Sequence, residues 1–208
     1  MVALNAGILI VPKLELRIPE LIIPSFDPEH HVYQLDGKVL PGVTSVLQAV
    51  GIIDIRWFTA QRREEGHAIH LACQLYDEGD LDPESVDPAI QPYLEAHIAY
   101  RRDIGQIPDI LEWPLANTAL GYCGTPDGVT FGKALEDIKS GAYEPWHRVQ
   151  AAAYAYLLPE PMSVERRAVY LHGDGRYSTR TFPKAELWGD FNTFQSALNI
   201  YNWKARNK

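Results

Sequence analysis

The sequence predicts an α/β domain built on a central mixed, partly antiparallel β-sheet flanked by helices. Helical segments predominate between residues 44 and 105, three strand-like runs cluster between residues 110 and 140, and a helix, a hairpin and a last helix follow. This order of elements is typical of layered α/β architectures. At 208 residues the chain is long enough for one domain with a substantial core, and it shows no internal repeat or low-complexity linker.

Residues 1–24 are predicted to form an extended arm or edge segment before a main domain at 25–208. Apolar and polar residues alternate within the arm, but Pro12, Pro19 and Pro24 interrupt the pattern. Because proline cannot donate a hydrogen bond to a sheet, we expect this segment at an edge.

Turn and cap residues delimit the elements of the main domain. Asp36-Gly37 and Gly173-Asp174-Gly175 are turns between strand-like runs. Thr44 is the expected N-cap of a short helix, Asp87-Pro88 begins a longer one, and Pro159 closes another. The predicted order is a hairpin at 31–40, helices at 44–50, 57–77 and 87–105, strands at 110–116, 122–130 and 133–140, a helix at 145–158, a hairpin at 165–182 and a helix at 184–203.

Composition and charge narrow the functional classes. The formal net charge of −8 argues against a protein that coats nucleic acid indiscriminately, although an acidic chain suits carboxylate metal ligands. Cys73 and Cys123 have no metal-binding or disulfide spacing, so we expect reduced core cysteines of a cytoplasmic protein. No apolar run approaches a membrane span, and the first 20 residues do not resemble a signal peptide.

Two carboxylates and a lysine form the most informative pattern. A hairpin through Phe131-Gly132-Lys133 would fold Asp127 back beside Asp137. Side chains alternate along a strand, so Asp137 and Lys139 share a face that Glu136 does not. Paired carboxylates favour Mg²⁺ or Mn²⁺, and a nearby ammonium group can neutralise charge that develops on a phosphate. The pattern indicates a metal-dependent nuclease.

Two further pairs have helical i, i+4 spacing. Gln150 and Tyr154 would project from one face of the helix after Lys139, with Trp146 one turn earlier. Such side chains suit contacts to a nucleic-acid backbone and to an unpaired base. Gly66 would leave open space beside His70, whose imidazole is a good metal ligand.

The motifs Gly66-x-x-x-His70, Gly124-x-x-Asp127, Asp137-x-Lys139 and Gln150-x-x-x-Tyr154 occur in the order that resembles the PD-(D/E)XK nuclease superfamily. The likeness is to its RecB-like exonuclease branch, phage-type members in particular, and covers about residues 27–182. It implies a restriction-endonuclease-like fold and a metal-dependent DNA exonuclease acting on linear DNA, single- or double-stranded. One or two Mg²⁺ or Mn²⁺ ions would serve as cofactors.

The resemblance also implies residue roles. Asp127, Asp137, His70 and the backbone carbonyl of Ile138 would bind the metal. Lys139 would orient or activate the attacking water and stabilise the transition state, with Asp127 and Asp137 as its catalytic partners.

The residues expected to contact DNA are Gln150, Tyr154, Trp146, Arg148, Arg62 and Arg63. A second copy of the chain or a recombination protein could be a further partner.

Alternative interpretations apply to each residue taken alone. Asp127 could be a turn residue, His70 and Tyr154 ordinary helix residues, and the arginines a solvated helix face. At the level of function, the alternatives are a structure-selective endonuclease or junction resolvase, an RNA nuclease, and an inactive DNA-binding module of the same fold.

Overall fold

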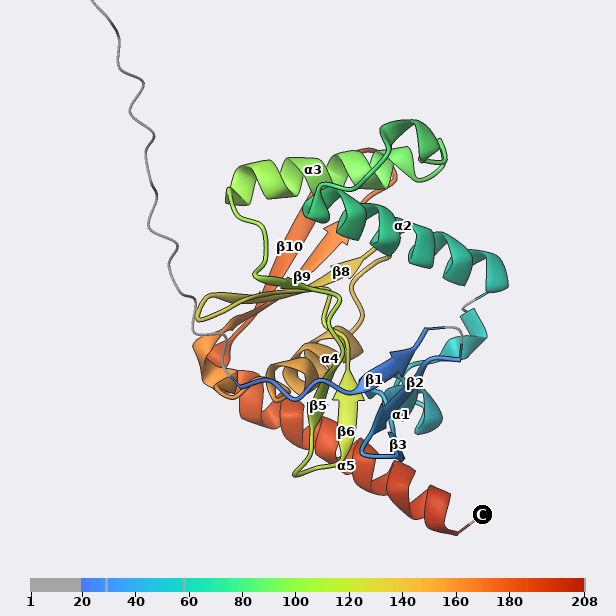
Figure 1. The fold of residues 1–208 in the computed structure, drawn as a ribbon, viewed down its shortest axis with the longest axis vertical. Helices are drawn as coiled ribbons and strands as arrows, with labels where there is room; N and C mark the ends of the chain where they lie inside the picture. Colours follow the sequence, from blue (N-terminus) through green and yellow to red (C-terminus); the bar gives the residue numbers. More distant parts are fainter. Residues whose placement is uncertain (1–19, 29, 58, 208) are drawn as a thin grey trace, which may run out of the picture.

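A five-stranded mixed sheet lies at the centre of the computed structural model, which describes residues 20–28, 30–57 and 59–207. Figure 1 shows helices α2 and α3 on one face of this sheet and α4 and α5 on the other. The expected α/β architecture with a central mixed sheet between helices is confirmed. In spatial order the strands are β10 (Tyr177–Phe182), β9 (Glu165–Leu171), β8 (Ala134–Lys139), β7 (Gly128–Thr130) and β4 (Ile110–Leu111).

Five α-helices are described, and four single 3₁₀ turns lie between the other elements. The helices are α1 (Val43–Ala49), α2 (Ala60–Glu78), α3 (Gln91–Ile104), α4 (Trp146–Ala155) and α5 (Leu187–Arg206). The 3₁₀ turns span Ile55–Trp57, Pro83–Ser85, Pro161–Ser163 and Lys184–Glu186. Helix α2 begins where the Thr59 hydroxyl accepts the N–H of Arg62, and it ends at Gly79, whose φ of 79° closes the helix in the left-handed region.

The connection through α4 makes the sheet mixed. Strands β8 and β9 are parallel, and α4 crosses between them, whereas β7–β8, β9–β10 and β4–β7 are antiparallel pairs. Helix α4 therefore lies directly over the face that Asp137 and Lys139 share.

Two small sheets flank the central one. The first contains β1 (Ser25–Asp27), β2 (Val32–Leu35) and β3 (Lys38–Leu40), and the second contains β5 (Leu115–Asn117) and β6 (Tyr122–Gly124). The β2–β3 hairpin was expected from Asp36-Gly37, and both turn residues have positive φ, 49° and 74°. Of the expected N-terminal arm, residues 1–19 lie outside the described residues. The carbonyl of Ile22 accepts a hydrogen bond from Ala116 of β5 at 2.8 Å.

Several predicted boundaries were wrong. Gly42 rather than Thr44 is the N-cap of α1, because the Thr44 hydroxyl lies inside the helix and accepts a hydrogen bond from Gln150. Helix α3 begins at Gln91, after a turn in which the Asp87 carboxylate accepts the N–H of Ala89. The runs at 110–116 and 122–130 are each divided between two sheets, so four short strands replace two long ones.

The core is divided between the two faces of the sheet. One cluster packs α4, α5 and α1 against Leu135 and Ala168, and the other packs α2 and α3 against Ile138 and Val169. Both cysteines are buried and unpaired, as expected. None of the helices in the described ranges has the length and apolar character needed to cross a membrane.

Candidate metal centre

The candidate metal centre lies where β7 and β8 separate. Continuing their register by one residue places Asp127 opposite Asp137. Pro126, which comes next, has no N–H and cannot extend the ladder. The Asp127 side chain replaces the missing partner, because its Oδ2 accepts the backbone N–H of Ile138. Since the N–H and C=O of one strand residue point to the same edge, the Ile138 carbonyl also faces Asp127.

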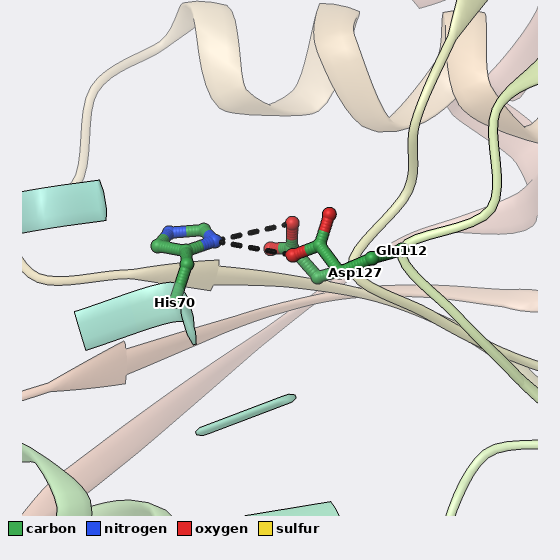
Figure 2. Close-up of side chains that lie close together, drawn as sticks. All are labelled: His70, Glu112 and Asp127. Carbon is green, nitrogen blue, oxygen red and sulfur yellow. Dashed lines mark ion pairs between the residues drawn. The ribbon is translucent and has the colours of Figure 1, made fainter. Parts of the chain in front are cut away.

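Three side chains from different segments converge there. His70 Nδ1 lies 3.3 Å from Asp127 Oδ1 and 3.6 Å from Glu112 Oε1. One ligand atom from each residue lies within 4.8 Å of the other two. Figure 2 shows the His70 imidazole, carried by α2, pointing toward both carboxylates. The cluster offers one imidazole nitrogen and several carboxylate oxygens, and no sulfur. These donor atoms suit a hard or borderline divalent cation.

Sequence reasoning missed Glu112. The β4–β7 register pairs Leu111 with Gly128, so Glu112 falls opposite Asp127, and its N–H donates to the Asp127 carbonyl at 3.2 Å. Its φ of 51° marks a turn away from the strand. A signal was present, because Glu112 is an acidic residue inside the apolar run around Leu111 and Trp113.

The electrostatics of the cluster favour a bound positive charge. Burial alone would lower the pKa of His70, but the carboxylates of Asp127 and Glu112 outweigh it and raise that pKa to about 10. Burial and the charge of Asp127 raise the pKa of Glu112 to about 7. For Asp127, burial opposes ionisation, but the attraction of His70 dominates and lowers the pKa. The protonated imidazole of His70 thus offsets the charge of the Asp127 and Glu112 carboxylates, and a bound metal ion could offset it in the same way.

Asp137 and Lys139 lie beside this cluster. Lys139 Nζ is 2.7 Å from Asp137 Oδ2 and donates a hydrogen bond to Gln150 Oε1 at 2.9 Å. Burial raises the pKa of Asp137 to about 6. The negative charge of Asp127 adds to this rise, and the positive charge of Lys139 opposes it. The two sequence-predicted carboxylates and the lysine are therefore brought together.

Gln150 and Tyr154 lie behind the lysine. Both are buried, and Gln150 Nε2 donates to Thr44 Oγ1 and to the Tyr154 hydroxyl, each at 3.1 Å. A Cβ atom at Gly124 would lie 2.7 Å from the Tyr154 ring, so only glycine fits there. These contacts position Lys139.

The other residues predicted to contact DNA lie in different parts of the fold. Lys139 Nζ lies 5.4 Å from the centre of the Trp146 ring, so Trp146 adjoins the site. Arg62 and Arg63 are exposed in the first turn of α2, about two turns before His70. Arg148 instead makes ion pairs with Glu186 and with Asp190, the latter at 2.6 Å, on the side toward α5. The structure does not bring Arg148 to the cluster, and its contact with DNA stays a prediction.

Glu136 points to the opposite face, as strand alternation predicts. Its carboxylate accepts hydrogen bonds from the Tyr100 hydroxyl and from Arg101, and Arg101 also pairs with Asp77 at 2.8 Å. His97 contacts the same Asp77 carboxylate at 3.0 Å. This buried network connects α2, which carries His70, with α3 and β8.

No family model matches the chain, and no curated protein does. Among solved structures, the chain is similar to an alkaline exonuclease, LHK-Exo, from Laribacter hongkongensis, with 17% identity over 80% of this chain and 91% of that one and a TM-score of 0.33. LHK-Exo in complex with dAMP gives 16% identity over 81% and 92%, with a TM-score of 0.32. Because both TM-scores are low, this similarity carries no argument about function.

Proposed function

We propose that this protein is a metal-dependent nuclease that hydrolyses phosphodiester bonds of DNA. One observation carries the proposal: a His70–Glu112–Asp127 cluster lies beside a buried Asp137–Lys139 pair, at the point where two strands separate. The pKa values of His70, Glu112 and Asp137 are all raised there, and perturbed ionisable groups concentrate at functional sites.

A divalent ion, Mg²⁺ or Mn²⁺, would be held by His70, Asp127, Asp137 and the Ile138 carbonyl, with Glu112 as a further ligand. The donor set fits this group because its oxygens are hard ligands and its repelling carboxylates need a cation between them. When bound, one or two such ions lower the pKa of a coordinated water and stabilise charge on the phosphate.

The chain itself would supply Lys139 as the catalytic cation. Asp137 and Gln150 fix its ammonium group, so it can donate to the attacking water or to a phosphate oxygen without reorganisation. Gln150 and Tyr154 would act mainly by bracing the lysine. Trp146, Arg62 and Arg63 would contact the DNA.

We further propose that the protein belongs to the RecB-like branch of the PD-(D/E)XK superfamily, which its motif order resembles, and that it acts as an exonuclease on linear DNA. A structure-selective endonuclease would use the same residues. An inactive DNA-binding module would have the same fold without the catalytic activity. The presence of all the proposed catalytic groups favours an active enzyme.

The test compares the wild-type protein with Asp137→Ala on linear and circular DNA, single- and double-stranded, with Mg²⁺, Mn²⁺ or EDTA. Metal-dependent loss of linear DNA alone, absent from the variant, is the expected result. Cleavage of circles would assign an endonuclease. A folded protein that cleaves no substrate would overturn the enzymatic proposal.

A further inference from the structure

A groove opens on the sheet face that carries Lys139, outside the metal centre. It has a volume of about 290 Å³ and lies between the loop at 141–143 and strands β9 and β10. A second hollow, of about 550 Å³ at the β9–β10 turn, shares His172 and Ser178 with it. The two hollows adjoin, and their volumes are just below and within the range of ligand pockets.

Strand register aligns this groove with the candidate site. Lys139 pairs with Tyr170 across the parallel β8–β9 ladder, and Tyr170 pairs with Ser178 of β10. One step back along the same face, Asp137 aligns with Ala168, which pairs with Arg180. Side chains in register share a face, so Arg180 and Lys139 point to the same side of the sheet. The three neighbouring strands are visible in Figure 1.

Arg180 is held in place without a carboxylate. Its guanidinium carbon lies 3.7 Å from the centre of the Tyr143 ring, a stacked arrangement that fixes the plane of the group. Within the described ranges, no ion pair involves this exposed side chain. Arg176 in the adjoining hollow differs, because it pairs with Asp174 at 2.5 Å. An oriented guanidinium with free N–H groups is suited to bidentate binding of a phosphate.

We propose that this groove binds the nucleic-acid strand next to the scissile position, with Arg180 contacting a backbone phosphate and Tyr143 fixing the arginine. The inference rests on the proposed function for the location of the scissile phosphate. Its ligand is the backbone of a single DNA strand, because the groove offers one oriented cation and aromatic walls, Tyr143 and Tyr170, rather than a wide basic surface.

The test measures binding of a fluorescently labelled single-stranded oligonucleotide in EDTA, so that no cleavage occurs. Wild-type protein is compared with Arg180→Gln and with Arg206→Gln. Arg206 lies in the last turn of α5, far from β10 in Figure 1, and gives the same charge change. The expected result is at least about tenfold weaker binding by Arg180→Gln alone. Its salt dependence should also decrease by about 0.7 in log–log slope, the value for one phosphate contact on a single strand.

Wild-type affinity of a folded Arg180→Gln variant, or equal losses in both variants, would overturn the inference. Metal-dependent cleavage by the wild-type protein is assayed separately. If the protein cleaves DNA but its binding does not depend on Arg180, the nuclease proposal stands and the groove proposal is wrong. If binding depends on Arg180 but no DNA is cleaved, the groove proposal stands and the nuclease proposal is wrong.

Discussion

The ammonium group of Lys139 lies 2.7 Å from a carboxylate oxygen of Asp137, two residues earlier on the same face of β8. The pair is nearly buried, so neither charge is well solvated, and each depends on the other and on neighbouring polar groups. This arrangement holds the ammonium group of Lys139 in one orientation before any substrate arrives.

Replacement of Lys139 by methionine should therefore abolish cleavage while metal binding persists. We expect the rate of DNA hydrolysis to fall at least about 100-fold, because one fixed donor to the transition state is lost. Lys133→Met, at an exposed lysine in the β7–β8 turn, is the matched control and should cleave normally. Undiminished turnover by Lys139→Met would refute its catalytic role.

Replacement of Glu112 by glutamine should weaken metal binding. The isosteric amide keeps the shape of the side chain but removes one negative ligand, so Mn²⁺ affinity measured by calorimetry should fall at least about tenfold. Glu64→Gln on the exposed surface of α2 provides the control. If the two variants bind Mn²⁺ equally well, Glu112 is not a ligand.

The buried network behind the sheet should contribute strongly to stability. Arg101 contacts both Asp77 and Glu136, so Arg101→Met leaves two buried carboxylates without their main partner. Urea unfolding should show a loss of about 3–5 kcal/mol. Its exposed neighbour gives the control, Arg102→Met, with an expected loss below about 1 kcal/mol. Similar losses for the two variants would mean that the network is energetically neutral.

His147 should make the fold sensitive to acid. It is buried against Tyr170, and burial, with the charge of Lys139, lowers its pKa from 6.5 to about 3. The unfolded chain therefore binds a proton that the folded protein excludes, and stability present above pH 6.5 is lost as pH falls toward 3. This group alone accounts for up to about 1.4 kcal/mol per pH unit.

Urea unfolding at a series of pH values checks this prediction. His147→Gln should show a shallower decline of stability with acid, whereas His67→Gln, at an exposed position on α2, should keep the wild-type slope. Identical slopes for all three proteins would show that His147 does not exclude the proton.

Local sequence information predicted the parts of the site that depend on one hairpin. Alternation along β8 separated Asp137 and Lys139 from Glu136, and the short β7–β8 connection required Asp127 to return beside Asp137. These relations follow from strand geometry and need no distant contact.

The remaining features depend on long-range pairing. Glu112 joins the cluster only through the β4–β7 register. The predicted strand at 122–130 was too long, because Pro126 cannot extend the ladder. Arg148 lies about 200° around α4 from Gln150 at 3.6 residues per turn. Its orientation was thus predictable, but its partners about 40 residues later, Glu186 just before α5 and Asp190 on it, were not.

The most direct test of the account is the position of a bound Mn²⁺ ion, measured by anomalous X-ray scattering from crystals grown with Mn²⁺. We predict a peak within bonding distance of His70, Asp127, Asp137 and the Ile138 carbonyl, with Glu112 as a further ligand, and its loss in Asp127→Asn. A peak elsewhere, or none at a saturating Mn²⁺ concentration, would contradict the metal centre and with it the proposed chemistry.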